Sequence, residues 1–114
     1  MIEITSVENW QKEAGKANET YLLYKHSTTC PISARAYHVV ESFEKYYTTF
    51  PILMVKVIES RPLSLHLAEH FSVEHASPQI ILIKDGQPIF HTSHNRITGK
   101  TIEQAMQDAG LAKN

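Results

Sequence analysis

The sequence predicts an α/β domain with a mixed central sheet and helices on both faces. Three observations support this fold class. Apolar runs of strand length alternate with segments whose apolar residues recur every three or four positions, in the order βαβαβαββα. The run from Ile52 to Ile58 is nearly continuous and β-branched, which is typical of a strand covered on both faces. Asp85-Gly86, between two apolar runs, predicts a tight hairpin and therefore an antiparallel edge.

Composition limits the function classes. The 114 residues fit one domain, expected over 1–114, and 42% hydrophobic residues can form a core. With 11 basic and 12 acidic residues and no charged run, nucleic acid is not an expected partner. No apolar run reaches the length of a membrane span, and residues 1–5 lack the pattern of a signal peptide. We therefore expect a cytoplasmic protein that does not bind membranes.

The first elements follow from local patterns. Alternation over residues 2–4 predicts a short edge strand. Thr5 and Glu8 have capping-box spacing, so we expect Thr5 to cap a helix that stops near Gly15. The apolar run Tyr21–Lys25 predicts the second strand.

A longer helix is predicted from Ile32. Its apolar residues advance by three and four positions and form one stripe: Ile32, Ala36, Val39, Val40, Phe43 and Tyr47. Pro51 ends this segment, because the residue before a proline avoids the helical region. The strand Ile52–Ile58 follows.

The second half has the same alternation. Ser60 and Pro62 predict a helix start, a loop spans 72–78, and Gln79–Ile83 reads as a buried strand. The returning strand Pro88–His91 contains a proline, which favours the sheet edge. After a polar loop over 92–98, the last helix is expected to start near Thr101, capped with Gln104, and to end at Gly110.

Cys30 is the only cysteine, and it lies between the second strand and the long helix. Strand–helix–strand units imply parallel pairing, and ligands of open α/β sheets gather beyond the carboxyl ends of the strands. Helix N-termini present unpaired N–H groups that stabilise a thiolate, the reactive form of cysteine. Pro31 suits the first helical position, where its missing N–H has no partner. The alternative is a small buried hydrophobic residue, but the polar flanks favour an exposed thiol.

Together with Ser77-Pro78 before a strand and the final hairpin and helix, Thr29-Cys30-Pro31-Ile32-Ser33 resembles the monothiol bacilliredoxins, a YtxJ-like family of the thioredoxin-like superfamily. The resemblance covers essentially the whole chain. It implies a thioredoxin-like fold in which Cys30 is the nucleophile and Pro78 is a cis-proline that shapes the substrate groove. The backbone of Ser77 then pairs with an extended substrate. Ser33 occupies the place of a resolving cysteine and cannot form a disulfide.

The resemblance also implies an activity: removal of bacillithiol from mixed disulfides on cytosolic proteins. Bacillithiol is then a thiol co-substrate, with no bound cofactor, and the partners are S-bacillithiolated proteins. A low-molecular-weight thiol or another redoxin resets Cys30. Two alternatives stay open: a thiol-bearing adaptor that is itself modified without turnover, and a redox-inactive module with a buried cysteine.

Pro31 and Ile32 are expected to shape the site, and the other neighbours of the cysteine have two interpretations each. Thr29 either lines the approach to the sulfur or is a solvated loop residue that orders the turn. Ser33 either donates to the sulfur or is an ordinary first-turn residue. His26, four residues before the cysteine, either pairs with the thiolate or simply packs at the strand end. We favour packing for His26.

Seven histidines invite a metal hypothesis. The pairs His66/His70 and His91/His94 each offer two ligands, which do not make a site, so no metal is expected. Lys25, Lys56 and Lys84 lie in or at the ends of strands. We expect them mainly to protect sheet edges and favour solubility, with positive potential near an anionic ligand as the alternative.

Overall fold

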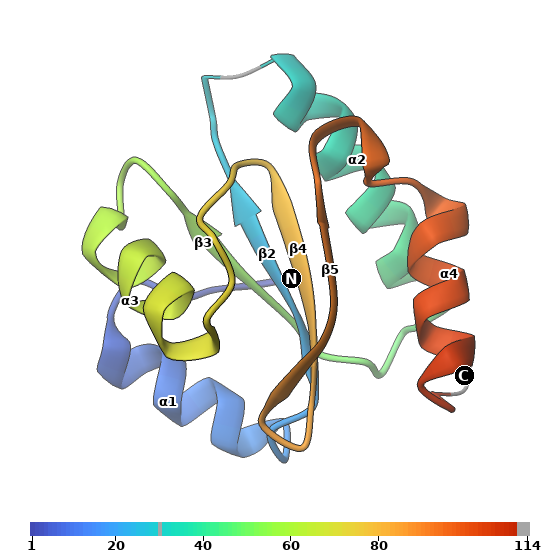
Figure 1. The fold of residues 1–114 in the computed structure, drawn as a ribbon, viewed down its shortest axis with the longest axis horizontal. Coiled ribbons are helices and arrows are strands. Elements are labelled where there is room, and N and C mark those ends of the chain that lie inside the picture. The colour runs from blue at the N-terminus through green and yellow to red at the C-terminus, as the bar shows by residue number, and fades with distance from the viewer. Residues whose placement is uncertain (30, 112–114) are drawn as a thin grey trace.

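The computed structural model describes residues 1–29 and 31–111 (Figure 1). Helices and strands alternate as the sequence predicts, with a short 3₁₀ helix before the last α-helix. The elements in chain order are β1 (Ile2–Glu3), α1 (Val7–Lys16), β2 (Tyr21–His26), α2 (Pro31–Tyr46), β3 (Ile52–Lys56), α3 (Arg61–Phe71), β4 (Gln79–Lys84), β5 (Gln87–Ser93), η1 (His94–Arg96) and α4 (Gly99–Asp108).

The five strands form one mixed sheet in the order β1-β3-β2-β4-β5. β1 and β3 run parallel, as do β3 and β2, whereas β4 is antiparallel to both β2 and β5. The prediction that every strand–helix–strand unit gives parallel pairing is therefore wrong for β3-α3-β4. After α3, residues 72–78 return the chain to the carboxyl end of β2, so that Gln79 pairs with Lys25 at the start of β4.

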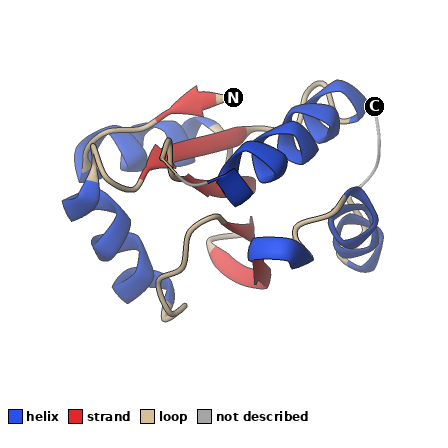
Figure 2. Cartoon of the chain, turned by 90° about the horizontal axis from the view of Figure 1, so that it is seen from above, coloured by secondary structure: helices blue, strands red, loops and turns tan. Residues whose placement is uncertain are grey.

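Two apolar cores lie on opposite faces of the sheet. In Figure 1, α1 and α3 lie to the left of the sheet and α2 and α4 to the right, and Figure 2 shows the same separation from above. Leu23 and Leu53 face α1 and α3, while Leu22 and Tyr24 face α2 and α4. The central strand β2 therefore contributes to both cores, as expected for a strand covered on both faces. No helix within residues 1–29 and 31–111 is long and apolar enough to span a membrane.

Two helix starts differ from prediction by one or more residues. Ser6, rather than Thr5, caps α1: its side chain accepts from the N–H of Asn9 at 3.0 Å. Thr98, rather than Thr101, caps α4, and the two threonines close a reciprocal capping box. Several neighbouring hydroxyl residues satisfy the cap pattern, so the spacing alone does not fix the register.

We expect Ser6→Ala to destabilise the protein by about 1 kcal/mol, because the N–H of Asn9 loses its partner at the exposed helix end. Thr5→Ala is the matched control. The hydrogen bond of Thr5 to the Asn9 side chain uses its backbone N–H, which alanine retains. Urea unfolding of both variants measures the difference, and an equal loss in the two would contradict the assignment of Ser6 as the cap.

Candidate thiol site at the start of α2

The structure places the predicted site residues around the junction between β2 and α2. β2 ends at His26 and α2 begins at Pro31, and Thr29, Pro31 and Ile32 are exposed there. Cys30 lies outside the described residues. It is covalently joined to Pro31, the first residue of a 16-residue helix. The N–H groups of that first turn lack intrahelical partners, as expected for a helix start that favours an anion.

His26 packs against two tyrosines at this junction. The hydroxyl of Tyr24 and Nδ1 of His26 are 2.7 Å apart, and the rings of His26 and Tyr37 are 5.3 Å apart. Tyr24 is fully buried, and burial raises its pKa, so its hydroxyl stays protonated. Burial, together with the charge of Lys56, lowers the pKa of His26. The imidazole is therefore neutral at pH 7, which agrees with the packing interpretation.

A cavity of about 270 Å³ opens beside this junction. It brings the end of β2 together with the first turns of α2, and its lining residues are His26, Ser27, Thr28, Ala34, Tyr37 and His38. Thr28 also contacts Glu59 at 3.5 Å between side-chain oxygens. Its wall combines the largely apolar side chains of Ala34 and Tyr37 with the hydroxyls of Ser27 and Thr28 and two imidazoles.

Ser33 is fully buried in the first turn of α2. Its hydroxyl has no hydrogen-bond partner among the described residues. Buried hydroxyls in native proteins nearly always have a partner, so this group needs an explanation. Ser33 lies three residues after Cys30, within the same helical turn.

The second predicted part of the site is Ser77-Pro78. This peptide bond is cis, as the family resemblance implied. Lys25 pairs with Gln79 in the antiparallel ladder, so one step further places Pro78 opposite His26 at the end of β2. The carbonyl of Pro78 accepts from the N–H of His94 at 3.0 Å. Among the described residues, neither the N–H nor the carbonyl of Ser77 has a backbone partner.

The structure adds a residue that sequence reasoning placed wrongly. Lys25 has no exposed surface, although we expected it to protect an edge and favour solubility. Its Nζ lies 3.2 Å from Nδ1 of His75, which is 3.4 Å from the hydroxyl of Ser64 on α3. Burial lowers the pKa of Lys25 to about 8. The side chain faces α3 because residues alternate along β2, and Lys25 follows Tyr21 and Leu23 on that face.

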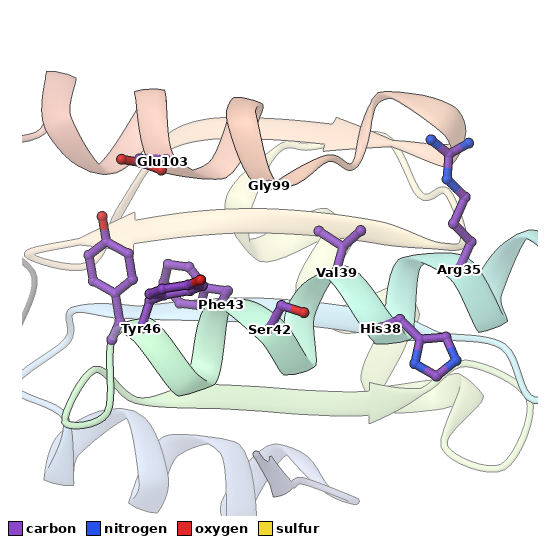
Figure 3. A pocket seen from close by; sticks show the side chains of 9 residues that line it. Arg35, His38, Val39, Ser42, Phe43, Tyr46, Gly99 and Glu103 are labelled. Carbon is purple, nitrogen blue, oxygen red and sulfur yellow. The ribbon is translucent and has the colours of Figure 1, made fainter.

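A second cavity, of about 700 Å³, lies between α2 and α4 (Figure 3). Arg35 lies at one end of it and Tyr46 and Glu103 at the other, with Val39 and Phe43 forming an apolar middle. None of its lining residues is a nucleophile of the predicted site.

The His66/His70 pair, which invited the metal hypothesis, packs against an aromatic side chain. His66 and His70 pack on Trp10, with ring centroids 5.8 and 4.9 Å from it. No group of three potential metal ligands occurs within residues 1–29 and 31–111. The His66/His70 spacing is thus explained by aromatic packing between α3 and α1.

Comparison with known proteins agrees with this geometry. The family model described as monothiol bacilliredoxin BrxC matches residues 2–102. The chain belongs to the monothiol bacilliredoxin family. A solved structure described as a candidate oxidoreductase with a thioredoxin fold is 29% identical, covers 91% of each chain and has a TM-score of 0.83. Fasciola hepatica thioredoxin is 16% identical over 95% of this chain and 98% of its own, with a TM-score of 0.76.

A further neighbour, a thioredoxin from Nicotiana alata, is 19% identical over 94% of this chain and 90% of its own, with a TM-score of 0.74. These more distant matches establish the fold alone. The family and the fold together make this bacilliredoxin a thiol oxidoreductase of the thioredoxin type.

Proposed function

We propose that this chain removes bacillithiol from mixed disulfides on cytosolic proteins, with Cys30 as the nucleophile. The family match over residues 2–102 carries this proposal. Support from the site comes from the attachment of Cys30 to the first residue of α2 and from the exposure of Thr29, Pro31 and Ile32 around it. An accessible thiolate at a helix N-terminus meets the requirements of thiol–disulfide exchange.

The proposed cycle needs one cysteine and two exchange steps. The Cys30 thiolate attacks the bacillithiol sulfur, a new S–S bond forms, and the client protein leaves as its own thiolate. A thiolate from a low-molecular-weight thiol or another redoxin then attacks the bacillithiol sulfur on Cys30. Cys30 leaves as a thiolate, and bacillithiol ends in a disulfide with the reductant. The two electrons that release the client therefore come from the external thiols.

The buried Ser33 hydroxyl has a role in this proposal. We propose that this hydroxyl donates to the Cys30 thiolate during exchange, because it is buried without a partner among the described residues and Ser33 follows Cys30 by about one helical turn. Donation to a thiolate favours the charged form. The segment at Ser77 supplies the second part, a free backbone edge with which an extended client strand pairs.

The test follows bacillithiol by mass. The reduced protein is incubated with a purified client carrying one bacillithiol group, and both proteins are measured by intact mass spectrometry at short times. We expect the bacillithiol mass to leave the client and appear on Cys30 before any external thiol is added. A client that keeps its bacillithiol overturns the proposal. If the chain is modified by oxidised bacillithiol but releases no client, the adaptor hypothesis replaces it.

A further inference from the structure

A buried polar cluster joins β2 to the chain segment that contains Ser77-Pro78, and the chemistry above does not use it. At its centre is the ammonium group of Lys25, on the central strand β2. Among the described residues it pairs with no carboxylate, and its one hydrogen-bond partner is Nδ1 of His75 at 3.2 Å. A desolvated lysine without a counter-charge costs stability, so its presence on a central strand requires a reason.

The contacts of the cluster all lead to one stretch of chain, residues 74–79. Nδ1 of His75 accepts from Lys25, and the Gln79 side chain donates to the carbonyl of Glu74 at 3.0 Å. Gln79 is also the cross-strand partner of Lys25, so their side chains lie on the same face of the sheet. Lys25 has no exposed surface, whereas His75, its hydrogen-bond partner, is exposed.

Two further polar atoms, on the residues that flank Pro78, have no partner among the described residues. The Oε1 atom of Gln79 and the hydroxyl of Ser77 are buried and unsatisfied among the described residues. Lysine has three donor hydrogens, and His75 accepts only one of them. Two buried atoms without partners among the described residues therefore lie on the residues either side of Pro78, in the segment that Lys25 contacts through His75.

We propose that Lys25 is a positioning residue for the exchange reaction: its buried ammonium group holds residues 74–79 so that the backbone of Ser77 stays available to a client strand. This inference rests on the proposed function for the identity of the client. Lys25 touches neither the client nor the reacting sulfurs in this account. It acts through His75 and Gln79.

The decisive variant is Lys25→Met, which keeps the length and apolar stem of the side chain but removes the ammonium group. We expect about a tenfold rise in the KM for a bacillithiolated protein, with the rate of Cys30 alkylation by iodoacetamide unchanged within twofold. Alkylation by a small reagent needs no paired client strand. Lys84→Met is the matched control, because Lys84 lies at the other end of β4 and donates to the carbonyl of Ala109. Lys84→Met should leave both the KM and the alkylation rate unchanged.

A double-mutant cycle tests whether Lys25 affects the KM through His75. If Lys25 acts through His75, then His75→Leu should raise the KM in the same direction, and adding it to Lys25→Met should produce little further rise. Independent, multiplying losses in the two variants would overturn this route. A KM of Lys25→Met equal to that of wild type, or a matching loss of alkylation rate, would overturn the positioning role.

Measurements of protein stability distinguish a positioning role of Lys25 from a general contribution to folding. Between pH 8 and 10.5 the unfolded chain retains a proton on Lys25 that the folded chain has lost, because burial lowers the folded pKa to about 8. Wild-type stability therefore rises with pH in this window, relative to Lys25→Met. The polar groups around the Lys25 side chain are His75, its cross-strand neighbour Gln79, and Ser64, which contacts His75. The charge of Arg61 also acts on His75. At pH 7 we expect Lys25→Met to melt no lower than wild type, so a lower melting temperature would contradict this reasoning.

Amide hydrogen exchange measures how firmly residues 74–79 are held, and it needs no client protein. In Lys25→Met, the amides of Ala76, Ser77 and Gln79 should exchange at least about tenfold faster, whereas those of β3 should not change. Unchanged exchange in the segment overturns the positioning role even if clients are processed. Faster exchange in a protein that processes no bacillithiolated client retains the role of Lys25 and rejects the proposed function instead.

Discussion

Replacing Cys30 with alanine should reduce the release of bacillithiol from a client protein to the uncatalysed rate. The chain has one cysteine, so no other side chain can accept the bacillithiol sulfur in an S–S bond. The fold should be retained, because the first turn of α2 is otherwise unchanged and neighbouring Thr29, Pro31 and Ile32 are exposed. Single-turnover transfer measured by intact mass is the assay, with circular dichroism as the check on folding.

Ser33→Ala provides a graded comparison for the same chemistry. If the buried Ser33 hydroxyl donates to the sulfur, its removal destabilises the thiolate and moves the midpoint of Cys30 alkylation to higher pH. Transfer should slow at pH 7 but persist. Transfer by Cys30→Ala at the wild-type rate would remove Cys30 from the mechanism altogether. An unshifted midpoint in Ser33→Ala would leave Ser33 as an ordinary helix residue.

The sequence predicted the order of elements because strand and helix periodicities are local. It predicted the edge position of β5 from Pro88, and that prediction is confirmed. It did not predict that β4 runs antiparallel to β2, since this depends on the path of residues 72–78 after α3. Such a path is fixed by tertiary packing and leaves little trace in hydrophobic periodicity.

The candidate site likewise has features that the sequence predicted and features that depend on tertiary packing. Local patterns placed Pro31 and Ser33 at the start of α2, whereas the cis bond before Pro78 was expected from the family resemblance alone. The burial of Lys25 was missed, because a lysine at the end of an apolar run normally marks a strand end. The alternation along β2 was the available indication: Lys25 follows Tyr21 and Leu23 on one face, and both of these are core residues. A polar residue that alternates with core residues on one face of a strand should be predicted as buried.

Truncation of the central strand should cause the largest loss of stability. Leu23 is fully buried on β2 and packs in the core beneath α1 and α3. We expect Leu23→Ala to destabilise the protein by about 3 kcal/mol, within the range of about 2 to 5 kcal/mol for buried leucines, because a cavity forms that the two neighbouring strands prevent from closing. For a domain of this size that loss corresponds to a fall in melting temperature of roughly 10 °C or more.

Ile58→Ala is the control for Leu23→Ala, because it also removes an aliphatic side chain but at a position that is 56% exposed. Its effect should stay below about 0.5 kcal/mol. Urea unfolding at pH 7 compares the two, and equal losses would contradict the placement of Leu23 in the core. At temperatures well below the transition, Cys30 in Leu23→Ala should still be alkylated at the wild-type rate. The reactivity we assign to the thiol arises at the start of α2, and the core on the opposite face of the sheet contributes to it only by keeping the chain folded.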